Sequence, residues 1–177
     1  MLNVASKPLP FRQRLKTVNH ADYKIILKAL GKPTMKAYAI DDSQYLMAFE
    51  YFARAKETGF QKFTDIGQRF EQLIAFIIEQ VPDDTIVYFL HHVETDASGR
   101  LKAKTIGKML DEKLTVEGLF SIVLLARSEK GRYWFQTQSE GYCTAKSPMG
   151  MFEPEIDNDL HMVDTIIRDY YEIGGNV

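Results

Sequence analysis

Apolar residues recur every three or four positions in four stretches of the chain, the spacing that places them on one face of a helix. The most regular stretch carries Ile66, Phe70, Leu73 and Ile77. Asparagine, serine or aspartate precedes three stretches, with Asn19 as the expected N-cap of the first, and a glycine follows two of them. The pattern predicts helices at about residues 21–30, 44–58, 63–80 and 160–173.

Short, continuously apolar runs predict strands instead, because a strand covered on both faces has no exposed side to keep polar. Residues 37–40 and 85–90 are such runs, and Leu2–Val4 is a shorter one. Residues 119–138 predict two strands joined by a tight turn. The polar segment 94–104 predicts either a mobile loop or a projecting hairpin.

The order of these elements predicts a layered α/β fold: strand, helix, strand, two helices, strand, hairpin, helix. Buried strands that alternate with amphipathic helices indicate a mostly parallel sheet, here with an antiparallel hairpin at its C-terminal end. We expect one domain over residues 1–177. Ligands of such sheets bind at the carboxyl ends of the strands, where Asp41–Asp42 and His91–His92 follow two predicted strands. We therefore expect acids and imidazoles at one edge of the sheet.

The composition excludes some classes of function and some kinds of site, but it indicates no specific function. The 177 residues are 45% hydrophobic and 26% charged, with a formal net charge of -2 and a pI near 6.1, which argues against a basic surface for duplex DNA. Cys143, the single cysteine, excludes an intramolecular disulfide and a cysteine-cluster metal site, and we expect it to be a small buried residue. The apolar runs are too short for a membrane span and no signal-peptide pattern is present, so we expect a cytosolic protein without membrane contact.

Asp41 and Asp42 form the first candidate site. Because Mg²⁺ prefers carboxylate oxygens and keeps several waters, one aspartate at a strand end suffices to hold it beside phosphates. The second acid could polarise an attacking water. In the alternative interpretation, Asp42 or Ser43 caps the following helix and Asp41 is a solvated turn residue. The motif alone leaves both interpretations open.

His91 and His92 form the second candidate site. Adjacent residues of a strand point to opposite faces, so the two imidazoles are not expected to bind one ion. One of them could hydrogen-bond a phosphate or position a water. Alternatively, both are simply the polar end of a buried strand.

A basic region follows, and its cations are Arg100, Lys102, Lys104, Lys108 and Lys113. In an extended segment Lys102 and Lys104 share a face and could bind phosphates or single-stranded nucleic acid. No aromatic residue is interleaved, so a solvated loop is the alternative. For the aromatic segment around Trp134, core packing is expected and base stacking is the alternative.

A phosphate-binding loop of the form G-x-x-x-x-G-K-[ST] is absent from the sequence. For Gly31–Lys32 the first glycine would fall on Ile26, and for Gly107–Lys108 it would fall on Lys102. A glycine-rich dinucleotide fingerprint is absent too. The backbone N–H cradle that holds nucleotide phosphates is therefore not predicted in this chain.

Nearly the whole chain resembles a bacteriophage family of RecA-like, AAA-domain P-loop ATPases, found near phage recombination and replication genes. The stretches that carry the resemblance are "NVASKPLPF", "AYAIDDSQYLM", "KFTDIGQ", "KAKTIGKMLDEKLTVEGLFSIVL" and "TAKSPMGMFEPEIDNDL". The last two are long and unusual enough to be specific.

The resemblance implies a three-layer RecA-like core that binds ATP and Mg²⁺. Asp41 and Asp42 would occupy the Walker B position, with Asp41 as the Mg²⁺ ligand, and His91 or His92 would lie at the sensor position. The residues implied to face phosphates, or to act in trans on a neighbouring subunit, are Lys104 and Lys108.

The chain departs from the family at its beginning. In the family, a strand, the P-loop and its helix precede the "NVASKPLPF" stretch, on which Met1 almost falls here. We therefore expect a truncated RecA-like domain with an open sheet that a second copy or another partner covers. ATP binding by the chain alone is then expected to be weak or absent, with no ATPase activity. Single-stranded DNA or recombination proteins are the expected partners.

Two alternatives remain open. The chain could be a non-enzymatic phage protein that binds and inhibits a host defence complex in the host cytosol, in the manner of an anti-CRISPR protein. Alternatively, the natural protein begins further upstream and includes the P-loop.

Overall fold

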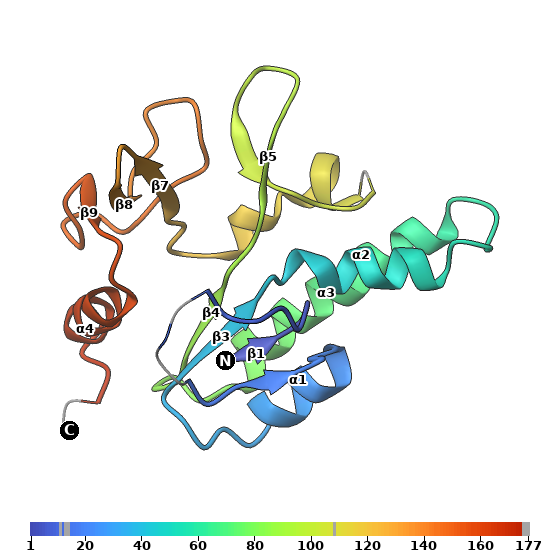
Figure 1. Cartoon of the computed structure of the whole chain (residues 1–177), viewed down its shortest axis with the longest axis horizontal. Helices are drawn as coiled ribbons and strands as arrows, with labels where there is room; N and C mark the ends of the chain where they lie inside the picture. Colours follow the sequence, from blue (N-terminus) through green and yellow to red (C-terminus); the bar gives the residue numbers. More distant parts are fainter. Residues whose placement is uncertain (11, 13–14, 108, 175–177) are drawn as a thin grey trace. The chain divides into compact units, whose positions relative to one another are not determined.

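Figure 1 shows the fold as a computed structural model, which describes all residues except 11, 13, 14, 108 and 175–177. Contacts between residues divide the chain into two compact units. The first comprises Met1–His92 and Lys104–Val116, and the second comprises Val93–Ala103 and Glu117–Val177. Each unit is described by itself.

A four-stranded parallel sheet forms the centre of the first unit. Its strands are β1 (Leu2–Asn3), β2 (Val18–Asn19), β3 (Ala37–Asp41) and β4 (Ile86–Phe89). They lie in the order β2-β1-β3-β4, and β3 pairs with β4 in the register Ile40↔Phe89. The predicted mixed α/β fold with a parallel sheet is confirmed, although the sequence pattern does not predict the two-residue strand β2.

Three helices pack together in the same unit, namely α1 (Tyr23–Leu30), α2 (Gln44–Ala53) and α3 (Gln61–Gln80). α3 packs against both α1 and α2, and its Phe70 ring lies 6.2 Å from the Phe89 ring of β4. Gly67 of α3 allows close packing of the π-helical segment Met109–Leu114, since a Cβ at Gly67 would lie 3.1 Å from the Cε atom of Met109. The buried core includes Ile26, Leu30, Ile40, Met47, Ile66, Phe70 and Leu73.

The start of the first helix differs from its prediction. α1 begins at Tyr23, and its N-cap is Asp22, whose Oδ1 accepts a hydrogen bond from the Ile25 backbone N–H at 2.8 Å. Asn19, the predicted cap, lies in β2 instead. Asp22 satisfies a helix N–H that has no intrahelical partner, so it sets the start.

The end of the second helix also differs. α2 ends at Ala53 rather than near residue 58. Beyond it, the N–H of Ala55 donates to the Phe52 carbonyl at 3.2 Å and the N–H of Glu57 to the Arg54 carbonyl at 3.0 Å. These bonds reach back three residues, so the chain continues as tight turns rather than as an α-helix.

β4 is more exposed than its apolar sequence predicts. All four residues of Ile86–Phe89 are partly exposed, so the expectation of a strand covered on both faces is wrong. Among the described residues β4 has a hydrogen-bonded neighbour strand on one side only, because it is the last strand of its sheet. An edge strand loses the cover that a central strand receives from its second neighbour.

The second unit is built mainly from antiparallel strands, which are β5 (Val93–Thr95), β6 (Leu101–Ala103), β7 (Leu125–Glu129), β8 (Arg132–Gln136) and β9 (Glu155–Asp157). β5 and β6 form a hairpin, so the hairpin alternative for the polar segment is confirmed. β7 and β8 form the second predicted hairpin, turning at Lys130–Gly131 with φ angles of 48° and 83°. These strands form two sheets of their own and do not extend the parallel sheet.

A last helix and two predicted core residues complete the second unit. α4 (Leu160–Tyr170) begins after Asp159, whose Oδ1 accepts from the His161 N–H at 2.8 Å, as the sequence predicts. Trp134 and Cys143 are both buried, which confirms their expected packing role. In the part of the chain that the structure describes, no helix combines the length and apolar character that crossing a membrane requires.

Candidate functional site

The carboxyl ends of β3 and β4 bring acids and imidazoles to one edge of the parallel sheet. The two strands run side by side in the same direction, so Asp41–Asp42 and His91–His92 leave the sheet at the same edge. The Ser43 N–H donates to the Leu90 carbonyl at 2.9 Å and holds the two strand ends together. This edge, with Asp41, Asp42, His91 and His92, is called the carboxyl-edge cluster below.

Asp42 is the centre of this cluster. Its Oδ1 lies 2.9 Å from Nε2 of His92, and its Oδ2 lies 2.7 Å from Nζ of Lys7. Burial by itself favours a higher pKa for Asp42, but the hydrogen bonds from Lys7 and His92 outweigh it and hold the pKa below its ordinary value. Asp42 also adopts a left-handed backbone conformation with φ of 57°, which is uncommon for residues other than glycine. Both oxygens of this carboxylate are therefore already in polar contacts.

A loop after β1 carries Lys7 to Asp42. The side chain of Asn3 shapes this loop, because its Nδ2 donates to the Lys7 carbonyl at 3.0 Å and its Oδ1 accepts from the Ser6 N–H at 2.8 Å. Asn3 is 1% exposed, so these bonds satisfy a buried amide. The asparagine of β1 thus fixes the backbone from which the lysine reaches the strand end.

Asp41 has a different environment, although it precedes Asp42 directly. It is the last residue of β3 and pairs in register with Asn3. Burial, followed by the neighbouring charge of Asp42, raises the pKa of Asp41 above its ordinary value. The pKa values of these two adjacent carboxyl groups therefore shift in opposite directions. An added cation near Asp41 would stabilise its charged form.

His91 packs inward from the same edge. Its Nε2 lies 2.8 Å from the Lys104 carbonyl oxygen and its Nδ1 lies 2.9 Å from Oγ of Ser43. A carbonyl oxygen only accepts, so Nε2 of His91 donates to the Lys104 carbonyl. The Ser43 hydroxyl, which contacts Nδ1, also donates to the Leu90 carbonyl at 3.1 Å. Ser43 occupies the N-cap position of α2 but makes no side-chain cap bond, so the capping expectation for its hydroxyl is wrong. The two histidines therefore contact different partners.

Of the two lysines that are predicted to face phosphates, the structure describes only Lys104. The backbone of Lys104 joins the carboxyl-edge cluster, since its N–H donates to the His92 carbonyl at 2.9 Å and its own carbonyl meets His91. Its side chain is exposed. Lys108 lies outside the described residues.

The side chains of the carboxyl-edge cluster could supply only a few of the ligands of a Mg²⁺ ion. Within the described residues no group of three or more His, Cys, Asp or Glu side chains is arranged to hold a metal ion. Asp41 offers a carboxylate, the ligand Mg²⁺ prefers, whereas both oxygens of Asp42 already contact Lys7 and His92. The residues therefore fit a Mg²⁺ that a nucleotide's phosphates carry and one aspartate contacts. They do not fit a metal site built by this chain alone.

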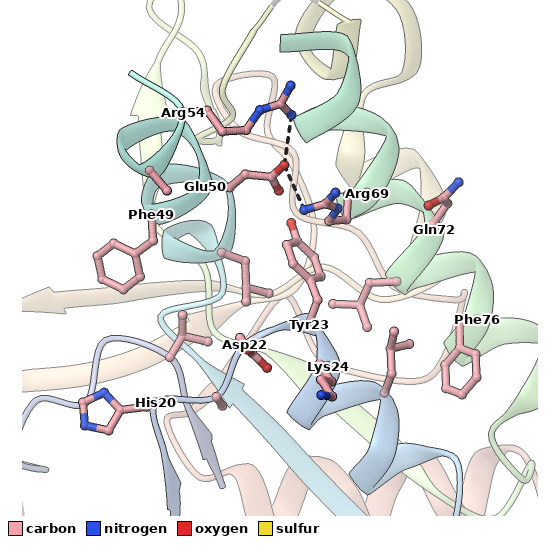
Figure 2. A pocket seen from close by; sticks show the side chains of 16 residues that line it. His20, Asp22, Tyr23, Lys24, Phe49, Glu50, Arg54, Arg69, Gln72 and Phe76 are labelled. Atoms are coloured by element: carbon pink, nitrogen blue, oxygen red, sulfur yellow. Dashed lines mark hydrogen bonds and ion pairs between the residues drawn. The ribbon is translucent and has the colours of Figure 1, made fainter. Parts of the chain in front are cut away.

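A second candidate site is a pocket of about 1050 Å³ lined by α1, α2 and α3 (Figure 2). Its polar end contains Glu50, whose Oε1 lies 3.2 Å from Nη1 of Arg54 and 3.1 Å from Nη1 of Arg69. The other oxygen, Oε2, is buried without a hydrogen-bond partner, and so is the hydroxyl oxygen of Tyr23. An unpaired buried polar group costs about 1–3 kcal/mol, so two of them at one place call for an explanation.

Tyr23 keeps its proton in this environment. Burial, followed by the charge of Glu50, raises the pKa of the Tyr23 phenol. Figure 2 shows its hydroxyl end directed toward the Glu50 carboxylate and Arg69. The pocket therefore presents one carboxylate acceptor and one hydroxyl donor at its polar end.

Sequence reasoning missed Lys7 as a member of the carboxyl-edge cluster. Lys7 follows β1, and β1 runs parallel to β3, so a strand-end argument applied to Leu2–Asn3 could have found it.

It also missed the polar end of the pocket. Glu50 follows Leu46 by four positions and Met47 by three, which places an acid on the buried stripe of α2. An acid in that position was the available signal, whereas its neighbours in the pocket, Tyr23 and Arg69, come from other helices.

Comparison with known proteins finds no family model, no curated protein and no solved structure that matches the chain.

Proposed function

We propose that this chain is a RecA-like protein of the ATP-binding type, associated with bacteriophage DNA recombination or replication, and that it has no ATPase activity on its own. The observation that carries the proposal is the carboxyl-edge cluster: β3 ends in Asp41–Asp42 and the adjacent parallel strand β4 ends in His91–His92. This arrangement supports the proposal, because the sequence resemblance implies that a Walker B strand lies beside a sensor strand.

Asp41 is the residue of this cluster that would contact Mg²⁺. Its raised pKa means that a nearby cation would stabilise its charged form. Mg²⁺, when bound, would neutralise charge on the nucleotide phosphates. His92 and Lys7 would hold Asp42 in place, and His91 would keep the end of β4 fixed through Ser43 and the Lys104 carbonyl.

The proposed lack of ATPase activity rests on the absence of a phosphate-binding loop from the sequence. Without this P-loop, the backbone cradle for phosphates is missing. In RecA-like proteins, as the resemblance implies, the P-loop strand pairs beside the sensor strand. In the described sheet β4 has no neighbour strand on that side. A phosphate-binding strand from another source would complete the site there.

An ATPase assay tests the proposal that the chain does not hydrolyse ATP on its own. The purified chain with Mg²⁺-ATP, with and without single-stranded DNA, is expected to release phosphate no faster than buffer. Turnover that disappears in Asp41→Asn and persists in Asp83→Asn, a change at an exposed aspartate of the same unit, would contradict the proposal.

A co-purification experiment tests the association with DNA metabolism. Tagged chain is used to capture partners from lysate of phage-infected host cells. Single-stranded DNA or recombination proteins are the expected partners.

A second candidate function is binding to a host protein, as in an inhibitor of the anti-CRISPR type. Two observations favour it: the carboxylate of Asp42 is already used by internal contacts, and Phe52 and Phe60 at the α2–α3 connection are 72% and 88% exposed. Large exposed aromatic side chains are common in binding surfaces. A single host protein captured in stoichiometric amount, and lost with Phe60→Ala, would favour this function over the first.

The length of the natural protein is a separate test. The intact mass of the protein isolated from its natural source distinguishes a chain that begins at Met1 from a longer one with a P-loop. A longer chain would turn the proposal into that of an active ATPase.

A further inference from the structure

The pocket among α1, α2 and α3 contains a polar end whose hydrogen-bonding capacity is not used. Glu50 Oε2 and the Tyr23 hydroxyl oxygen are buried and lack partners among the described residues. The Glu50 side chain is only 8% exposed, although it lines the pocket. A group that donates to Glu50 and accepts from Tyr23 would satisfy both atoms at once.

The charges around this point select a neutral group. Glu50 already contacts two guanidinium groups, those of Arg54 and Arg69, so its negative charge is compensated. A cationic ligand group would meet Arg69 beside Glu50, and an anionic one would meet the carboxylate itself. An uncharged N–H donor beside an uncharged acceptor avoids both repulsions.

Part of the remaining lining favours an apolar body. Leu27, Leu46 and Leu73 line it, together with the rings of Phe49 and Phe76. Figure 2 shows these two rings on opposite sides of the view, flanking the space in which Tyr23 and Glu50 lie. His20, Asp22 and Lys24 add polar groups away from the Glu50 end. Apolar walls with a few polar groups are the usual lining of a small-molecule site.

We propose that this pocket binds a neutral nitrogen heterocycle of the nucleobase type, with an N–H donor directed to Glu50 Oε2 and an adjacent ring acceptor directed to the Tyr23 hydroxyl. Adenine and cytosine present this pair of groups on one edge. Arg69 lines the pocket beside Glu50, and its side chain is 54% exposed.

Adenosine is the probe, titrated into the full chain and followed by calorimetry and by backbone amide chemical shifts. Saturable binding of one molecule is expected, with shifts concentrated in α1, α2 and α3. Purine riboside, which has the same ring without the amino donor, is expected to bind about tenfold more weakly or worse, the effect of losing a hydrogen bond to a charged group.

Tyr23→Phe tests the second contact. Because the Tyr23 hydroxyl has no partner in the described structure, the variant should fold with unchanged or higher thermal stability while binding adenosine about tenfold more weakly. Tyr133→Phe, at a tyrosine of β8 that is 64% exposed, is the matched control and should bind as the unmodified chain does.

Three results would overturn the proposal. Adenosine could give no saturable change, as expected if water alone fills the pocket. Purine riboside could bind as tightly as adenosine, or Tyr23→Phe could leave the affinity unchanged. The proposal does not rest on the proposed function, since adenosine carries no phosphate and the titration contains neither Mg²⁺ nor DNA.

Discussion

Asp41 and Asp42 are neighbours in the chain, yet the fold shifts the pKa values of their carboxyl groups in opposite directions. Asp41 stays on β3, where burial and the charge of Asp42 raise its pKa. At Asp42 the effect of burial is outweighed by Lys7 and His92, and the pKa is lowered. Because a shifted pKa is also a statement about stability, the two residues should give opposite pH dependences.

The first prediction concerns Asp41. Its folded-state pKa is raised, so its charge destabilises the folded state at neutral pH, and stability falls as pH rises from about 4 through the folded pKa. Asp41→Asn should therefore raise the free energy of unfolding at pH 7 by a few tenths of a kcal/mol, a small value because the site is partly solvated. Urea unfolding at pH 7 and pH 3 measures this, with Asp83→Asn as control. A variant less stable than the unmodified chain at pH 7 would show that Asp41 is stabilised as a charge.

The second prediction concerns Asp42 and has the opposite sign. Its folded-state pKa is lowered, so its contribution is complete above about pH 4 and disappears as pH falls through the folded pKa. Asp42→Asn should lower the free energy of unfolding at pH 7 by less than about 1 kcal/mol after solvent screening, and the difference should vanish at low pH. Unfolding curves measured between pH 7 and pH 2 test this. A pH-independent difference would mean that the charge of Asp42 is not responsible.

At the scale of elements, α3 packs against several parts of the first unit. Its 20 residues pack against α1, α2 and the segment Met109–Leu114. Phe70, in the middle of this helix, is fully buried and contacts the rings of Phe89 and His91 at 6.2 Å and 5.8 Å between centroids. One helix side chain thus supports both β4 and the imidazole at its end.

The third prediction follows from this position. Phe70→Ala should lower the free energy of unfolding by about 3–5 kcal/mol, since it removes a buried ring and leaves a cavity. Phe60→Ala, one residue before α3 and 88% exposed, should change it by no more than about 0.5 kcal/mol. Thermal and urea unfolding of the two variants compare them directly. Equal effects would contradict the packing described for α3.

At the scale of the whole molecule, the two units use different kinds of sheet. The first has the parallel sheet with β4 as its last described strand, and the second has antiparallel strands. The N–H groups of Ile86 and Leu90 donate toward β3, so by alternation the N–H of Val87 points to the other side of β4. An apolar strand with such an outward N–H is a site at which another strand can pair.

The fourth prediction is therefore self-association or association with a partner through β4. Light scattering of the purified chain should give a molar mass above the 20.3 kDa of one chain, decreasing on dilution. Val87→Pro removes the outward N–H without removing a donor to β3 and should shift the mass toward one chain, while circular dichroism checks that the helices remain. A mass of one chain at every concentration would contradict self-association.

The sequence by itself determined the elements whose signal is local. The spacing of Ile66, Phe70 and Leu73 predicts α3, and the run that ends at Asp41 predicts β3, because periodicity reflects which face of an element is buried. Even the meeting of the two strand ends is predictable, since parallel strands present their carboxyl ends at one edge.

Only the tertiary structure decided which distant residues meet. Lys7, Asp42 and His92 form one cluster, although 35 and 50 positions separate the second residue from the first and third. Tyr23 and Glu50 come from two helices and face each other in a pocket, although the local pattern marks only the acid on α2 and not the residue that it faces. The physical reason is that such contacts depend on how packed elements are positioned, and burial patterns record that an element is covered but not by what.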